Sequence, residues 1–156
     1  MTEKSARYAE DYKVGDVFDL GRIVVSQEEI IEFSKKWDPQ PFHIDEQNAG
    51  DSAYGGLIAS GWHVTLLMTR MMNDSGFISH ETSLGSPGLD GLKWLKPVRP
   101  GDMLSGTAEI TDVRVSRSKP ELGFVSHIAK LRNDAHEDVY VLKSTSIVKA
   151  RGIKPS

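Results

Sequence analysis

The sequence contains no cysteine, so its 156 residues form neither disulfides nor zinc sites with thiolate ligands. Long apolar runs are also missing, because no window approaches the roughly 20 mostly apolar residues of a transmembrane helix. Charge of one sign is not in excess: 19 basic and 22 acidic residues give a net charge of −3, whereas a dedicated nucleic-acid binder usually carries a basic face. We therefore expect neither a membrane nor a nucleic acid as partner.

The chain begins with polar residues and lacks the apolar core of a signal peptide, so a cytoplasmic location is the default expectation. A length of 156 residues with 38% apolar side chains predicts one domain over 1–156, with its core at about 10–150. Residues 1–15 are polar and are predicted to form a loosely attached arm.

Two helices are predicted from capping residues and apolar spacing. Segment 26–29 reads SQEE, a capping box that opens the first helix, and Pro39 ends it. The second helix begins at Ser60 or Gly61 and ends in the polar segment 73–76. Its broad apolar face needs a sheet to cover it.

Most of the remaining chain is predicted to be extended. The strand candidates are 17–25, 89–95, 103–115, 124–131 and 139–148. Because the helices are segregated from a run of consecutive strands, we expect an α+β fold with a mainly antiparallel sheet. Residues 38–60 show little periodicity and are predicted to be a loop, and loops of this length are more often functional than idle.

The segment 38–43 reads DPQPFH and places a carboxylate five positions before an imidazole. Its two prolines are expected to exclude a helix and to form a stiff turn that aims both side chains at one point. A carboxylate and an imidazole that share a pocket suit general acid–base catalysis. On spacing alone, the alternative is that Asp38 simply ends a helix and His43 is a surface loop residue.

Ser60 and Gly61 open the second helix, where the first backbone amides have no partner within the helix. Such amides, at the positive end of the helix dipole, can hold an anion or a developing oxyanion. A glycine there lets a ligand carbonyl approach closely. The alternative interpretation is an ordinary helix N-cap with no ligand.

At these residues the sequence resembles the MaoC-like dehydratases, which include the (R)-specific enoyl-CoA hydratases and have the hotdog fold. The family motif Asp-x-Asn-Pro-x-His matches 38–43, except that Gln40 replaces the asparagine, and Gly61 follows at the start of the second helix. Further similarity lies in 12–16 (YKVGD), 57–63 (LIASGWH), 95–102 (LKPVRPGD) and 116–120 (SRSKP). The resemblance therefore covers about residues 10–148, and it implies one antiparallel sheet wrapped around a long central helix.

The resemblance implies a reversible hydration of a trans-2-enoyl-CoA thioester to the (R)-3-hydroxyacyl product. Asp38 and His43 would be the catalytic pair, and the amide of Gly61 would hold the thioester oxygen. The residues expected to bind the substrate are Gln40, Phe42, Tyr54, Ile58, Ser60 and Trp62. No metal and no cofactor are implied, because CoA is part of the substrate. His63 is expected to be a core or interface histidine.

Two other functions remain open at this point. A hotdog thioesterase would hydrolyse the thioester with a carboxylate, but it does not call for the pairing of Asp38 with His43. A non-catalytic acyl-CoA-binding subunit would retain these residues without turnover. Hotdog units commonly pair through their sheets, and an exposed edge strand is otherwise a liability, so we expect a homodimer or a higher assembly of dimers.

Overall fold

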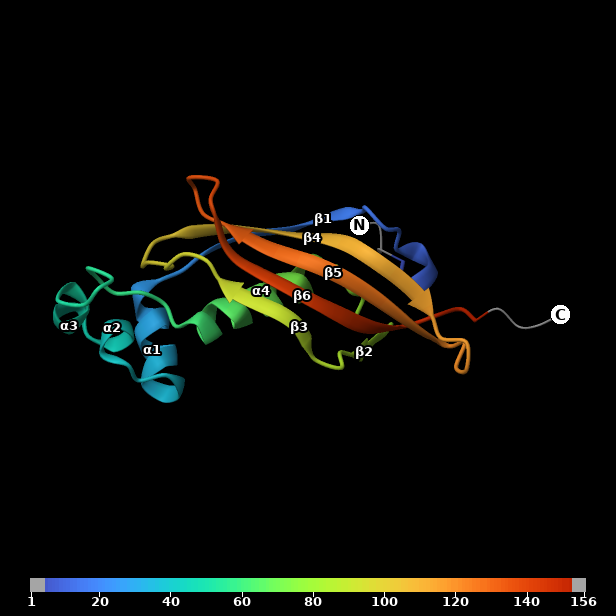
Figure 1. Cartoon of the computed structure of the whole chain (residues 1–156), viewed down its shortest axis with the longest axis horizontal. Helices are drawn as coiled ribbons and strands as arrows, with labels where there is room; N and C mark the ends of the chain where they lie inside the picture. Colours follow the sequence, from blue (N-terminus) through green and yellow to red (C-terminus); the bar gives the residue numbers. More distant parts are fainter. Residues whose placement is uncertain (1–4, 153–156) are drawn as a thin grey trace.

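The computed structural model describes residues 5–152, which contain a six-stranded antiparallel sheet (Figure 1). The strands are β1 (Val17–Val24), β2 (Ser83–Gly85), β3 (Leu89–Trp94), β4 (Met103–Val115), β5 (Leu122–Arg132) and β6 (Asp138–Lys149). Their order is β1-β4-β5-β6, and both β2 and β3 pair with the far side of β6. The predicted long strands are thus confirmed, whereas the three-residue β2 was not predicted.

The middle of the sheet shows why these residues form strands. In β5 the side chains alternate between buried and half-buried positions, with Val125, Ala129 and Leu131 on the buried face. This period of two is what a sheet with one covered face requires. The buried face packs around α4 (Gly61–Ser75), which lies behind the sheet in Figure 1.

Helix α4 buries one stripe of side chains at helical spacing. The buried members of this stripe are His63, Val64, Leu67, Met68 and Met71. The helix ends where Gly76 adopts a left-handed conformation, with φ of 70°, a C-terminal cap that favours glycine. This is the α+β arrangement of a sheet around a central helix that the sequence predicts. Within residues 5–152, no helix has both the length and the apolar character needed to cross a membrane.

Helix α1 (Gln27–Trp37) begins and ends as predicted. The hydroxyl of Ser26 accepts a hydrogen bond from the amide of Glu29 at 3.2 Å, and Asp38 follows as the C-cap. Beyond it, the prediction of a helix-free loop over 38–60 is wrong. The chain forms two short helices, α2 (Pro41–Ile44) and α3 (Glu46–Gly50). Pro41 occupies the first position of α2, where its missing amide hydrogen is not needed.

The prediction of a loosely attached arm is wrong for the described part of residues 1–15. A short 3₁₀ helix, η1 (Ala9–Asp11), packs against β4 and β5, and Ala9 is fully buried. The hydroxyl of Tyr12 donates a 2.6 Å hydrogen bond to the backbone oxygen of Phe77. Two buried side chains, Ala9 and Tyr12, attach this segment to the rest of the fold. The overall polarity of the segment, on which the prediction rests, does not show such single contacts. Residues 1–4 lie outside the described part.

Candidate active site

Asp38 and His43 come together at the junction between α1 and α2. Oδ2 of Asp38 lies 3.4 Å from Nε2 of His43. Asp38 is held by its amide, which donates to the backbone oxygen of Ser34 at 2.9 Å, and His43 is held within α2. The connection between α1 and α2 therefore aims both side chains at one point, as the sequence predicts. The expectation that the two prolines exclude a helix from 38–43 is wrong, because α2 begins at Pro41 and contains His43.

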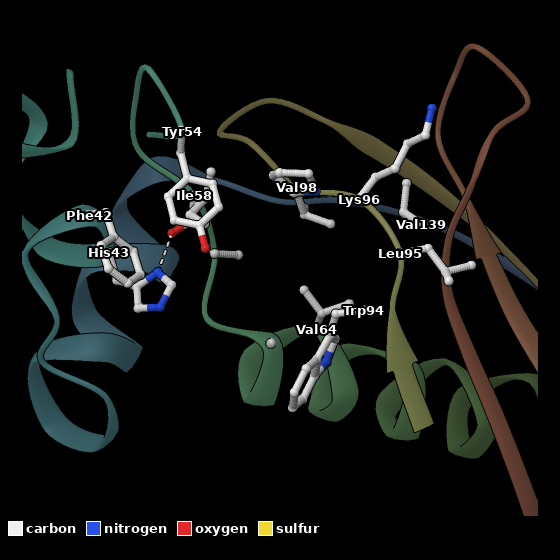
Figure 2. A pocket seen from close by; sticks show the side chains of 13 residues that line it. Phe42, His43, Tyr54, Ile58, Val64, Trp94, Leu95, Lys96, Val98 and Val139 are labelled. Atoms are coloured by element: carbon white, nitrogen blue, oxygen red, sulfur yellow. Dashed lines mark hydrogen bonds between the residues drawn. The ribbon is translucent and has the colours of Figure 1, made fainter. Parts of the chain in front are cut away.

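The orientation of His43 is fixed by a backbone carbonyl. Its Nδ1 lies 2.8 Å from the oxygen of Ile58, which can only accept a hydrogen bond, so Nδ1 carries a hydrogen (Figure 2). The amide of Ile58 in turn donates to the oxygen of Phe42 at 3.1 Å. The imidazole is buried, and Nε2 is left as the nitrogen that faces Asp38. Nε2 is therefore the atom of His43 that can exchange a proton with a ligand or with the carboxylate.

The carboxylate of Asp38 receives a donor on each oxygen. The hydroxyl of Ser60 donates to Oδ2 at 2.7 Å, and Nε2 of Gln40 donates to Oδ1 at 3.1 Å. Burial by itself raises the pKa of Asp38. The hydrogen bonds from Ser60 and Gln40 and the charge of His43 outweigh burial and lower this pKa below its ordinary value. Asp38 is thus ionised at neutral pH.

The first turn of α4 is not capped by a side chain. Ser60 is the N-cap residue, yet its side chain makes no capping hydrogen bond to the helix. A Cβ atom added to Gly61 would lie 2.6 Å from Cδ2 and 2.8 Å from Nε1 of Trp94. Glycine is required at position 61 because the indole of Trp94 occupies the space of a side chain.

A cavity of about 360 Å³ connects these elements (Figure 2). Five of the predicted site residues line it: Phe42, His43, Tyr54, Ile58 and Gly61. The other predicted residues lie beside it. Asp38 is not among the lining residues but contacts His43, which is, and Gln40 and Ser60 bond to Asp38. Trp62 is exposed, with its ring centroid 5.4 Å from that of Trp94.

Much of the cavity wall comes from residues that the sequence analysis did not single out as substrate-binding. They are Ala59, Val64, Trp94, Leu95, Lys96, Pro97, Val98 and Val139. Backbone hydrogen bonds bring them together, from the amide of Ala59 to the oxygen of Val98 and from the amide of Leu95 to the oxygen of Val139, both at 2.8 Å. The segment 95–98 follows an edge strand and has no periodicity, so only the family similarity of 95–102 pointed to it.

Two further histidines are buried away from this pair. The ring of His63 stacks on Phe33 with a centroid distance of 4.9 Å, and His127 contacts the ring of Phe77 edge-on at 5.1 Å. Burial lowers the pKa of both, because the charged form is poorly solvated there. Within residues 5–152, no three His, Asp or Glu side chains are grouped as metal ligands would be.

Similarity to known proteins extends over most of the chain. The family model described as MaoC like domain matches residues 11–130. The uncharacterized protein YdeM of Bacillus subtilis is 26% identical over 140 residues, which are 90% of this chain and 97% of that protein. Both similarities extend well beyond the 38–43 motif.

Two solved structures share the architecture. A MaoC-like dehydratase from Rhodospirillum rubrum is 34% identical, with a TM-score of 0.87 over 95% of this chain and 100% of the other. The R-hydratase PhaJ1 from Pseudomonas aeruginosa has a TM-score of 0.71 at 16% identity, over 96% of this chain and 91% of the other, and its likeness shows the fold. The sheet wrapped around α4 is therefore the hotdog fold.

Proposed function

Because the chain belongs to the MaoC-like dehydratase family, we propose that it is an (R)-specific enoyl-CoA hydratase, or in reverse a 3-hydroxyacyl-CoA dehydratase. The observation that carries this proposal is that His43, which contacts Asp38, and Gly61 at the start of α4 line one cavity. A carboxylate, an imidazole and unpaired helix amides are the groups that water addition to a conjugated thioester needs.

In the proposed hydration, a water lies between Oδ2 of Asp38 and Nε2 of His43. Asp38 takes one proton as the water oxygen bonds to the β-carbon, and protonated His43 gives the proton on Nε2 to the α-carbon. Both transfers occur on one face, which makes the addition syn. Asp38 then returns its proton to His43 across the 3.4 Å contact, which restores both groups. The reaction uses only the thioester and water, so we propose no cofactor or metal.

The thioester oxygen gains negative charge as the enolate forms. The amide of Gly61 at the positive end of the 15-residue helix α4 is the proposed donor for this oxygen. The hydroxyl of Ser60 bonds to Asp38 and not to the N2 or N3 amide of α4, so the first turn of the helix keeps its amides free of a side-chain cap. The apolar wall formed by Val64, Val98 and Val139 suits the acyl chain.

The acting unit is proposed to be a homodimer. The edge strand β3 and the outer face of α4 present an exposed apolar cluster of Trp62, Leu66 and Trp94, which is unusual on an isolated domain. Trp94 also lines the cavity, so a second copy that covers this cluster would border the site. Pairing of two β3 strands would also satisfy an open sheet edge.

The test is an activity panel of trans-2-enoyl-CoA esters with chiral analysis of the product. Loss of the conjugated-enone absorbance with formation of the (R)-3-hydroxyacyl thioester supports the proposal. Release of free thiol from saturated acyl-CoA without hydration would identify a thioesterase instead. Saturable binding of enoyl-CoA without turnover at any chain length would identify a non-catalytic acyl-CoA-binding subunit.

A further inference from the structure

Ser60 occupies a helix N-cap position but does not act as one. A serine at this position ordinarily accepts a hydrogen bond from an amide of the first turn. Ser60 is fully buried, and its side chain makes no such bond to α4. Its hydroxyl instead donates to Oδ2 of Asp38, 22 positions earlier in the chain, at 2.7 Å. The hydroxyl is therefore used for a contact between two elements and not for the helix.

We infer that Ser60 is a positioning residue that fixes the carboxylate of Asp38 against His43 and against the first turn of α4. This inference rests on the proposed function and adds to it a role for a residue that the sequence analysis placed among the substrate contacts. The oxygen that Ser60 holds is the one that lies 3.4 Å from Nε2 of His43. Its position decides where a water between the two groups can sit.

The contact also sets the spacing between the two halves of the site. Ser60 is followed directly by Gly61, whose amide is the proposed donor to the thioester oxygen. The general base and the oxyanion donor are thus connected through one buried side chain and one peptide bond. Misplacement of a reacting group by about 1 Å costs on the order of 100-fold in rate, so this connection bears directly on turnover.

The second donor to Asp38 does not duplicate this role. Gln40 bonds to Oδ1, whereas Oδ2 is the oxygen that lies against His43, and the side chain of Gln40 is exposed to solvent. Water can replace an exposed donor, whereas it cannot easily replace a buried one. Loss of the Ser60 hydroxyl therefore removes the buried side-chain donor to Oδ2, in a site where burial already disfavours the charged carboxylate.

The experiment compares wild type with Ser60→Ala by a carbon-13 NMR titration of the aspartate carboxyl groups, with Asp38→Asn to assign the Asp38 signal. The pKa of Asp38 is expected to rise in Ser60→Ala, because a donor that favours the charged form is lost. The acidic limb of kcat/KM for enoyl-CoA should move to higher pH with it. We expect kcat to fall by about 10-fold to 100-fold with KM nearly unchanged, since Ser60 is not among the residues that line the cavity.

The matched control is Ser75→Ala, which removes a hydroxyl that donates to the oxygen of Met72 at the other end of α4. It should leave both the titration and the rate unchanged. Ser60→Thr keeps the hydroxyl and should restore the low pKa of Asp38. If the added methyl group prevents folding in this buried position, the smaller alanine variant still decides the question.

An unchanged titration of Asp38 in Ser60→Ala overturns the inference, whatever the rate. A fall in rate through KM alone also overturns it, because that result marks a substrate contact. The NMR measurement needs no substrate, so it separates the two proposals. A shifted titration in a protein that hydrates no enoyl-CoA overturns the proposed function, whereas an unshifted titration in an active hydratase overturns only the role of Ser60.

Discussion

Nε2 of His43 faces Oδ2 of Asp38 because the opposite ring nitrogen is bound to the carbonyl of Ile58. A backbone group thus dictates which nitrogen takes part in proton transfer. This contact makes Asp38 and His43 a single proton-transfer pair, in which the carboxylate and the imidazole have different roles.

Asp38→Asn and His43→Ala are each expected to lower the hydration rate of crotonyl-CoA by at least about 100-fold, since each removes one proton-transfer partner. The measurement is the initial rate of enone loss at saturating substrate. Circular dichroism and thermal melting should show that both variants keep the fold. Near-normal hydration by either variant contradicts the proposed function.

Gly61→Ala is expected to destabilise the protein by about 1–3 kcal/mol, because its methyl group would enter the space of the Trp94 indole. Urea unfolding measures the change. Gly50→Ala is the matched control, since a Cβ added there meets nothing within 4 Å. The double variant Gly61→Ala/Trp94→Leu should recover part of the loss. Equal effects of the two alanine variants would show that the indole contact is unimportant.

Leu66→Glu is expected to convert the proposed dimer into monomers, because it places a charge in the exposed apolar cluster of α4 and β3. Light scattering at micromolar concentration gives the mass. Val17→Glu, on the exposed side of β1 at the opposite edge of the sheet, serves as control and should leave the dimer intact. A monomeric wild type, or dissociation by the control alone, would rule out the proposed interface.

The stability of the protein is expected to fall as the pH drops below about 6.5. Burial lowers the pKa of His127, and a hydrogen bond with the backbone of Val125 only partly offsets this effect. The unfolded chain then binds a proton that the folded protein resists, so acidification from the unfolded pKa toward the folded one favours unfolding. Above that range both states are neutral, and the group no longer affects stability.

This pH dependence is measured by urea unfolding at pH 7.5 and pH 5.5 in wild type, His127→Leu and, as control, His80→Gln, whose side chain is exposed. The drop in unfolding free energy between the two pH values should shrink in His127→Leu and persist in the control. An identical drop in all three proteins would show that the pKa of His127 is the same in the folded and unfolded states.

Periodicity and capping predicted the parts of the fold that are regular. Strand β4 has the bounds that alternation gives, and α1 and α4 begin at the residues that follow Ser26 and Ser60. Helices α2 and α3 are too short to show a helical period, and a proline is compatible with both a turn and a first helical position. Propensity alone therefore could not separate these two possibilities.

The site was predictable to the extent that it is local. Asp38 and His43 are five positions apart, and they meet at the short connection between α1 and α2. The apolar wall depends on β3 lying beside β6, which brings Leu95 to Val139, and no local pattern encodes that pairing. The contact between Ser60 and Asp38 likewise depends on how α4 approaches the end of α1.

The hydrogen bonds that orient Asp38 and His43 come from Gln40, Ile58 and Ser60, all of which lie outside residues 45–57. The chain between these anchors holds α3 and Tyr54, and within the described residues Tyr54 is its one contribution to the cavity wall. Substitutions at the exposed positions of 45–57, which exclude the buried core residues Ala49 and Leu57, should therefore leave the proton-transfer groups in place. Directed evolution of new acyl specificities should begin with libraries confined to this segment.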